Sequence, residues 1–187
     1  MQNAVDIEVI RALLPLAANN DIRHYLNGVY IDFQATRTIY VATQGHMLGI
    51  YTDTTAINED VHNTVIPRDV VKALKPKHAK LRMGTLHVNP DTREARILNP
   101  ANGQDFGFNP IEGRYPDYQR VVPKETSNEC ANYDAEYLYA FAQANKLLGA
   151  STPGHIVLHQ NGDKGASVKL CRNQFTGVIM PIRIRNA

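Results

Sequence analysis

The stretch EGRYPDYQRVVP, residues 112–123, decides the organisation of this chain. Gly113 permits a tight turn, Pro116 is incompatible with a helix interior, and Asp117 can bond to its own backbone. The sequence of residues 118–123 then predicts an extended, partly apolar segment that ends at a proline. The stretch therefore predicts a junction between two structural units, and not a catalytic site.

The composition is that of a globular protein. Of the 187 residues, 43% are hydrophobic and 20% are charged, enough to bury a core in one or two domains. The formal net charge of +2 neither requires nor excludes a nucleic-acid partner, because the distribution of charge matters more than its sum. No apolar run approaches the roughly 20 residues of a membrane span, and the N-terminus lacks a signal-peptide pattern. We therefore expect a cytoplasmic protein of a bacterium or of a phage-infected cell.

The sequence contains no convincing metal or catalytic motif. Cys130 and Cys171 lie far apart and fit no ligand spacing, so we expect two reduced thiols. His155 and His159 would project from the same side of a strand, but no cysteine or carboxylate lies near them. Nucleotide-binding and hydrolase motifs are also absent from the sequence. We expect no metal, no cofactor and no enzymatic activity.

The same order of a helix and several strands is predicted three times. In the first unit, Asp6 can cap a helix whose apolar residues recur at helical spacing, and Pro15 ends or kinks it. Strands are expected after it at residues 26–34, 37–44 and 46–53. The second unit has a strand at 63–67 and a helix at 68–74. Its later strands are expected at residues 79–84, 85–90, 94–100 and 105–110.

The third unit follows the junction and a polar segment. Asp134 can cap a helix that runs to Leu148, and Gly149 ends it. Strands are expected at 155–160, 166–172 and 175–184, with a tight turn at Asn161 and Gly162. Strands that face a layer of helices on one side give an α+β fold.

Three further stretches, together with the junction, resemble one protein family in the correct order. They are DIRHYLNGVYIDF (residues 21–33) followed by VATQGHMLGIY (41–51), then VIPRDVVKAL (65–74), and finally FTGVIMPIRI (175–184). The family is the bacterial DNA polymerase III beta subunit, the DNA sliding clamp. The resemblance implies the sliding-clamp fold, with repeated helix-plus-strands units whose helices lie on one side of antiparallel sheets.

The order of the matches implies a shortened clamp, which we expect to be phage-encoded. Residues 1–123 resemble the second clamp domain, as two units at about 1–60 and 61–123. Residues 124–187 resemble the C-terminal half of the third domain. No segment resembles the first domain.

The resemblance also implies a hydrophobic groove that accepts short peptides from polymerases and other replication proteins. Residue types suit that task, since apolar and flexible walls take leucine and phenylalanine anchors. The chain departs from the family at Gln44, where an acidic residue is usual, at Met47, where a basic one is usual, and at Asp134, where asparagine is frequent. The groove residues carried over are Leu26, Thr43, Gly45, His46, Leu48, Pro123, Tyr137, Val178, Met180, Pro181 and Ile182.

Double-stranded DNA is the second partner that the resemblance implies, bound without sequence preference. Helical spacing places Arg68, Lys72 and Lys75 near one face, the pattern of phosphate contact without base reading. A solvated helix face is the alternative interpretation of the same residues. A loop at Arg23, His24 and Tyr25 resembles a DNA-contacting loop of the clamp.

Two functions from different classes remain open on the sequence. The first is a replication processivity factor, a ring that would need roughly four copies of this chain as a homo-oligomer. The second is a clamp homologue that forms no ring and acts as a peptide-binding adaptor or decoy for replication proteins. A structural remnant with neither activity would follow if Tyr137 or the C-terminal segment blocked the groove.

Overall fold

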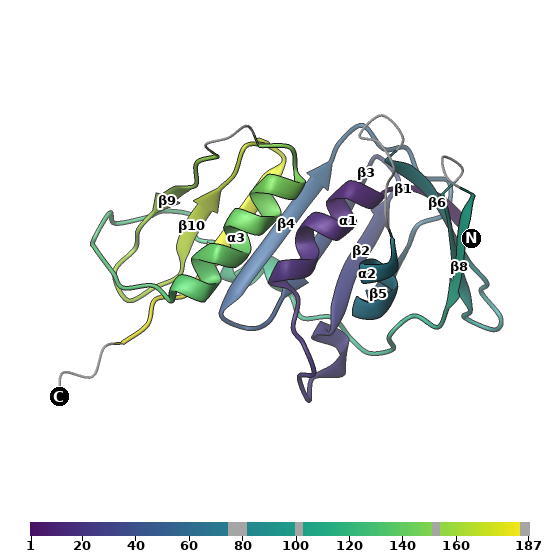
Figure 1. Ribbon diagram of the computed structural model, residues 1–187, viewed down its shortest axis with the longest axis horizontal. Coiled ribbons are helices and arrows are strands. Elements are labelled where there is room, and N and C mark those ends of the chain that lie inside the picture. Colours follow the sequence, from purple (N-terminus) through teal and green to yellow (C-terminus); the bar gives the residue numbers. More distant parts are fainter. Residues whose placement is uncertain (75–81, 100–102, 151–153, 184–187) are drawn as a thin grey trace.

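The structure, a computed structural model, describes residues 1–74, 82–99, 103–150 and 154–183. Within these residues the strands form two antiparallel sheets, and the α-helices cover one face of the larger sheet (Figure 1). The larger sheet is ordered β5 (His62–Pro67), β2 (Gly28–Gln34), β3 (Arg37–Thr43), β4 (Met47–Asp53), β11 (Phe175–Ile179), β10 (Ala166–Lys169) and β9 (Val157–His159). The smaller is ordered β1 (Gln2–Asp6), β6 (Met83–Val88), β7 (Ala95–Asn99) and β8 (Gln104–Phe108). The α-helices are α1 (Ile7–Leu13), α2 (Arg68–Ala73) and α3 (Ala135–Leu147). The α+β prediction is confirmed.

The helix boundaries follow from the capping residues in the sequence. Asp6 Oδ1 accepts hydrogen bonds from the amides of Glu8 (3.0 Å) and Val9 (3.2 Å), which caps α1. At its other end α1 passes into a 3₁₀ turn, Leu14–Leu16, that contains Pro15. Asp134 caps α3 through a 2.9 Å bond from the Glu136 amide. The predictions for both helices are confirmed.

The strand predictions for the second unit were partly wrong. Residues 79–84 and 85–90 were expected as separate strands, but one strand, β6, crosses that boundary, and residues 79–81 lie outside the described part. Strand β1 was missed because it pairs with β6, about eighty positions away, and no turn signal marks it. Such non-local pairing leaves no trace in a local sequence window.

The third unit joins the first through both a sheet and a charged cluster. Strands β4 and β11 pair directly, so the larger sheet is continuous between these units. Arg172 donates through Nε to the Leu148 carbonyl at the end of α3 (2.7 Å), and its Nη2 lies 3.3 Å from Glu8 Oε2. Arg82 Nε lies 3.1 Å from Asp6 Oδ2 beside the same helix N-terminus. These contacts hold the end of α3 against the start of α1.

The junction at residues 112–123 crosses the face of the larger sheet that lies opposite the helices. Tyr115 stacks on Tyr30 of β2 with ring centroids 4.4 Å apart and planes 12° apart. Burial raises the pKa of Tyr30 to about 12 and also raises that of Tyr115. A small buried cluster lies beneath: Ile39, Val41, Leu48, Ile50 and Val178. The junction is thus part of the fold and not a loose tether.

The junction is not fully extended, which corrects the prediction for residues 118–122. Tyr118–Val121 form a 3₁₀ turn, and the Val122 amide donates to the Gln119 carbonyl at 3.3 Å. The turn packs Tyr118 and Val122 against the sheet cluster and leaves Val121 55% exposed. Burial of two apolar side chains in so short a segment requires this change of direction.

None of the helices in the described part of the chain is long and apolar enough to cross a membrane.

Candidate functional site

The turn that joins β3 to β4 is held by its own side chains. Thr43 Oγ1 donates to the Met47 carbonyl (2.7 Å) and accepts from the Gly45 amide (3.1 Å). Gly45 has φ +105°, a conformation that an L side chain would strain. Gln44 Oε1 accepts from the His46 amide at 3.0 Å. The turn therefore has one fixed shape and presents His46 to solvent.

A small pocket of about 50 Å³ lies beside this turn. Strand pairing creates it, because Leu48 of β4 faces Val178 of β11, and the Met180 amide donates to the His46 carbonyl at 2.8 Å. Six of the predicted groove residues line it together with two that were not predicted, Met47 and Val121. The six are Thr43, Gly45, His46, Leu48, Val178 and Met180.

Tyr137, predicted for the same groove, lies on the first turn of α3. Its ring stacks on that of His46, with centroids 5.9 Å apart and planes 19° apart. The pair brings the start of α3 to the β3–β4 turn, so Tyr137 stands at the rim of the pocket. Its ring is half-buried there.

The other four predicted groove residues lie outside the lining of this pocket. Leu26 is only 2% exposed and belongs to the core. Pro123 is half-buried, two positions after Val121 on the junction. Pro181 follows Met180, and the Ile182 amide donates to the Asn132 carbonyl at 2.8 Å. Pro181 and Ile182 thus continue away from the pocket along the polar segment before α3.

The two departures from the family pattern have structural consequences at this turn. Met47 is 8% exposed and lines the pocket, where a basic side chain would bring charge. Gln44 bonds the backbone of the turn, and this contact needs only an oxygen acceptor. The pocket is accordingly apolar, with His46 as its polar neighbour.

Val121 was missed because the junction was expected to be extended. Its 3₁₀ turn directs the Val121 side chain outward to the pocket, while its neighbours face the sheet cluster. The signal that could have found it is a pair of adjacent apolar residues, Val121 and Val122, in a connecting segment, since neighbouring side chains point in different directions and one of them can reach a surface pocket.

The loop predicted to touch DNA is tied to both the turn and the junction. Arg23 bonds Asp21 through Nε (3.0 Å) and Nη2 (2.8 Å), and Nη2 also donates to the Gln44 carbonyl at 3.2 Å. These bonds lower the pKa of Asp21 to about 2. His24 Nε2 donates to the Glu112 carbonyl at 3.1 Å. Tyr25 contacts the His24 ring edge-on at a centroid distance of 5.8 Å.

The predicted basic stripe on α2 is only partly assembled. Arg68 turns inward, and its Nη1 donates to the carbonyls of Leu14 (2.9 Å) and Ala17 (3.2 Å) beyond the end of α1. Burial lowers the pKa of this guanidinium. Lys72 is exposed and pairs with Asp69 at 3.3 Å, and Lys75 lies outside the described residues.

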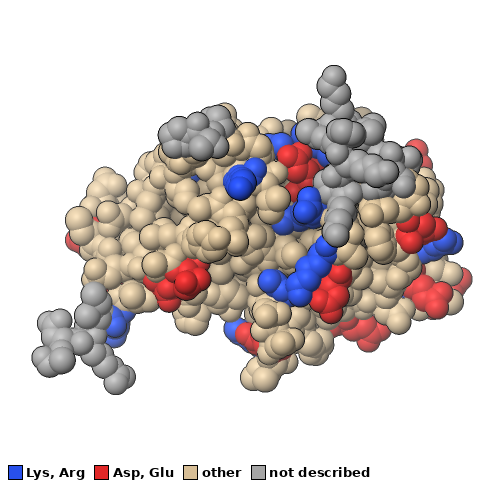
Figure 2. All heavy atoms as spheres, in the orientation of Figure 1, with Lys and Arg blue, Asp and Glu red and all other residues tan. Residues whose placement is uncertain are grey.

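The three helices enclose a shallow hollow of about 290 Å³. Figure 2 shows several basic side chains on this face of the molecule. Arg11 of α1, which the sequence did not group with Lys72, meets Lys72 and the inward Arg68 there because the helices pack side by side. The hollow is lined by Arg11, Leu14, Pro15, Arg68, Val71, Lys72, Gln143 and Leu147.

In the described ranges, histidine, cysteine and acidic side chains do not gather in any group of three or more that could hold a metal ion. His155 and His159 are both exposed beside or on β9.

Curated relatives of this chain are beta sliding clamps. The protein of Vibrio cholerae is 29% identical over 147 residues, which cover 78% of this chain and 39% of the relative. That of Haemophilus influenzae is 28% identical over 160 residues, covering 78% and 41%. The Escherichia coli K12 protein is 33% identical over 110 residues, covering 57% and 28%. The chain thus spans about two fifths or less of these relatives.

Solved clamp structures share the fold. The DNA polymerase III subunit beta of Pseudomonas aeruginosa superposes with a TM-score of 0.72 at 18% identity, covering 98% of this chain and 66% of that one. The Thermotoga maritima subunit gives a TM-score of 0.74 at 13% identity, covering 99% and 66%. At such identities the likeness establishes the sliding-clamp fold and nothing more specific.

The family follows from the sequence match. The family model described as the DNA polymerase III beta subunit, central domain, matches residues 2–117, well over half of the chain. This match covers nearly all of the chain before the junction and the first half of the junction itself. It confirms the resemblance inferred from the motifs: the chain belongs to the DNA polymerase III beta subunit family, the family of the beta sliding clamps.

Proposed function

We propose that this protein is a shortened sliding clamp that acts as a replication processivity factor, binding polymerase-type peptides in the pocket beside His46. One observation carries the proposal: six of the predicted residues, from three strands, a turn and the segment after β11, surround one apolar depression. Val121 of the junction adds a further wall. Met180 is unbranched and 36% exposed, so it can move to admit a side chain larger than the unoccupied space.

The proposal includes the domain division expected from the motifs. Residues 1–123 act as one clamp-like domain and residues 124–187 as a half-domain. The pocket supports this division because its walls come from both parts, with Leu48 on one side and Val178 on the other. The protein works in the cytoplasm, without a cofactor and without catalysis.

A fluorescent peptide with a glutamine and a Leu-Phe pair tests the groove. Burial of the two apolar anchors contributes about 3–6 kcal/mol before ordering costs are subtracted, which limits the dissociation constant to the micromolar range. We expect saturable binding by fluorescence anisotropy and competition by the unlabelled peptide. A wild-type protein that ignores the peptide at several hundred micromolar would refute the groove and leave the fold unaffected.

DNA binding forms the second part of the proposal. The hollow between the helices holds Arg11, Arg68 and Lys72, and the phosphate backbone is the ligand such a group suits. Arg68 is committed to carbonyl groups beside α1, so Lys72 is the described α2 cation best placed to meet a phosphate.

Replacing Lys72 with glutamate is expected to weaken binding to duplex DNA equally for all sequences. The slope of log affinity against log salt concentration should become shallower by about one unit, because about one phosphate contact is lost. Lys164→Glu, an equal charge change on the exposed turn between β9 and β10, is the matched control and should have a smaller effect. Equal effects of the two variants would mean that only net charge matters and would contradict a DNA face on the helices.

The adaptor or decoy function remains the second candidate, and one observation favours it. Arg68, the first cation of the predicted α2 stripe, points into the protein and donates to the Leu14 and Ala17 carbonyls. An adaptor would bind the peptide with no measurable affinity for circular or linear DNA, and the titrations above separate the two functions.

A further inference from the structure

The loop of residues 21–27, which precedes β2, is held rigidly by its own bonds. The Asp21 amide donates to Asn27 Oδ1, and Asn27 Nδ2 donates to the Asp21 carbonyl, both at 2.9 Å. Between these two residues, His24–Leu26 form a 3₁₀ turn. Figure 1 shows the loop, coloured dark purple, projecting beyond the lower end of the larger sheet. The bonds hold the loop in one shape although it lies outside the sheet.

The guanidinium group of Arg23 connects this loop to the β3–β4 turn. It bonds the Asp21 carboxylate through Nε (3.0 Å) and Nη2 (2.8 Å), and Nη2 also donates to the Gln44 carbonyl at 3.2 Å. The group lies against Gly45 as well, since a Cβ added there would be 3.1 Å from Nη2 and 3.3 Å from Nη1. Gly45 lines the pocket. Arg23 therefore supports a pocket wall through the backbone of the turn.

The same loop also contacts the junction. His24 Nε2 donates to the Glu112 carbonyl at 3.1 Å. Tyr25 packs against Gly113, because a Cβ added to that glycine would lie 3.3 Å from Tyr25 Cβ. From there the junction runs on to Val121, which lines the pocket. The loop thus joins the two segments, turn and junction, that carry walls of the pocket.

The charge of Arg23 is already balanced within the loop. Asp21 is ionised at neutral pH because its bonds to Arg23 lower its pKa to about 2. A phosphate that approached Arg23 would meet this carboxylate and would have to compete with two oxygens that already occupy the guanidinium fork. Arg23 is therefore a poor phosphate ligand, although the family resemblance implies a DNA contact for this loop.

We propose that Arg23 is a positioning residue of the peptide pocket: it holds the Gln44–Gly45 backbone and, together with His24, fixes the separation between the turn and the junction. The space in the pocket is only about 50 Å³, so a small shift of one wall decides whether an apolar anchor fits. A wall that is fixed beforehand also lowers the cost of ordering on binding. This inference rests on the proposed function, because the ligand is the polymerase-type peptide.

Arg23→Lys keeps the positive charge and removes the fork. A lysine ammonium donates from a single point and cannot bond both Asp21 oxygens and the Gln44 carbonyl in one arrangement. We expect the fluorescent peptide to bind about 5- to 10-fold more weakly, because the wall then becomes ordered only when the peptide binds. The midpoint of urea unfolding should stay near the wild-type value, since the Arg23 side chain is 46% exposed.

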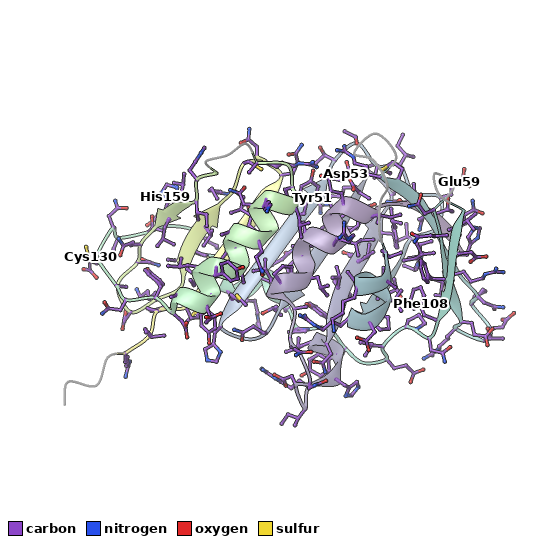
Figure 3. All side chains as sticks on the ribbon, viewed as in Figure 1. Tyr51, Asp53, Glu59, Phe108, Cys130 and His159 are labelled. Carbon is purple, nitrogen blue, oxygen red and sulfur yellow. The ribbon has the colours of Figure 1, made fainter. Side chains whose placement is uncertain are left out.

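Arg37→Lys is the matched control. Arg37 Nε donates to Gln34 Oε1 at 2.6 Å in the exposed turn between β2 and β3. The next residue, Thr38, pairs with Asp53 of β4, and Figure 3 labels Asp53 at the end of the strands opposite to the loop. The peptide affinity of this variant should stay within about twofold of the wild-type value.

A double-mutant cycle with Val121→Ala separates positioning from a general loss of stability. Val121 provides the pocket wall on the junction. If Arg23 sets the separation between that wall and the turn, Arg23→Lys should weaken binding much less once Val121 is truncated. A loss of stability alone would weaken binding by the same factor in both backgrounds. Equal factors would therefore overturn the inference.

Removing both charges of the pair tests the assignment against a DNA contact. Asp21→Asn combined with Arg23→Gln leaves the net charge of the protein unchanged. We expect weaker peptide binding, but an unchanged affinity for duplex DNA and an unchanged slope of log affinity against log salt concentration. A slope that is shallower by about one unit would assign Arg23 to a phosphate and would contradict the proposal.

Amide hydrogen exchange gives a readout that does not depend on the peptide. The Gly45 and His46 amides donate to side chains of the turn at 3.1 and 3.0 Å, so their exchange rates report its shape. We expect both amides to exchange faster in Arg23→Lys and at the wild-type rate in Arg37→Lys. Unchanged exchange in Arg23→Lys would show that Arg23 does not hold the turn. A wild type that ignores the peptide, with a turn that Arg23→Lys still loosens, would instead refute the peptide function of the pocket.

Discussion

Replacing Phe141 with alanine is expected to lower the free energy of unfolding by about 3–5 kcal/mol. Phe141 is fully buried on α3, and its ring meets that of Phe175 edge-on, with centroids 6.3 Å apart. Gly177 of β11 makes room for it, since a Cβ there would lie 2.7 Å from Phe141 Cε1. The alanine variant would leave a cavity that neighbouring strands cannot close without moving.

Urea denaturation followed by circular dichroism measures this loss. Tyr139→Ala, an aromatic truncation on the same helix at a residue 60% exposed, is the control and should change stability by about 0.5 kcal/mol or less. A loss of under 1 kcal/mol for Phe141→Ala would mean that α3 does not depend on this contact. The loss of stability would also affect the candidate site, because α3 holds Tyr137 at the rim of the pocket.

Local signals in the sequence were sufficient for the elements that local chemistry determines. Asp6 and Asp134 cap their helices as expected because the short aspartate side chain reaches the free amides two or three residues further along the chain. Strands β2, β3 and β4 could be predicted from runs of β-branched and aromatic residues separated by turn residues. Strand β1 could not, because its partner β6 lies far along the chain.

The candidate site shows the same division between local and long-range information. Four pocket residues belong to the turn between β3 and β4 or to the strand ends beside it, so a single sequence motif brings them together. They are Thr43, Gly45, His46 and Leu48. Val121 depends on a 3₁₀ turn that only packing against the sheet explains. Arg68 follows the helical spacing of a surface stripe, yet its long side chain reaches back to carbonyl groups of another element. Spacing places the Cα of a residue, but not the end of a flexible side chain.

Replacing Met180 with aspartate is expected to weaken binding of the glutamine and Leu-Phe peptide strongly. The substitution puts a carboxylate on a pocket wall where Leu48, Val178 and Met47 offer it no hydrogen-bond donor from their side chains. A penalty of about 2–3 kcal/mol on the bound state corresponds to roughly 30- to 150-fold weaker affinity. Starting from micromolar binding, the dissociation constant would rise to roughly tens or hundreds of micromolar, a shift that the anisotropy titration resolves.

The fold should tolerate this change, which makes the loss of binding interpretable. Met180 is 36% exposed in the unoccupied protein, so the new carboxylate can reach water until a peptide covers it. Val157→Asp provides the matched control: Val157 is 41% exposed on β9, opposite Lys169, and far from the pocket along the sheet order. The control should bind the peptide like the wild type, measured by the same anisotropy titration. Undiminished binding by Met180→Asp would place the peptide elsewhere on the protein, because an uncompensated charge cannot be covered by apolar anchors without weakening them.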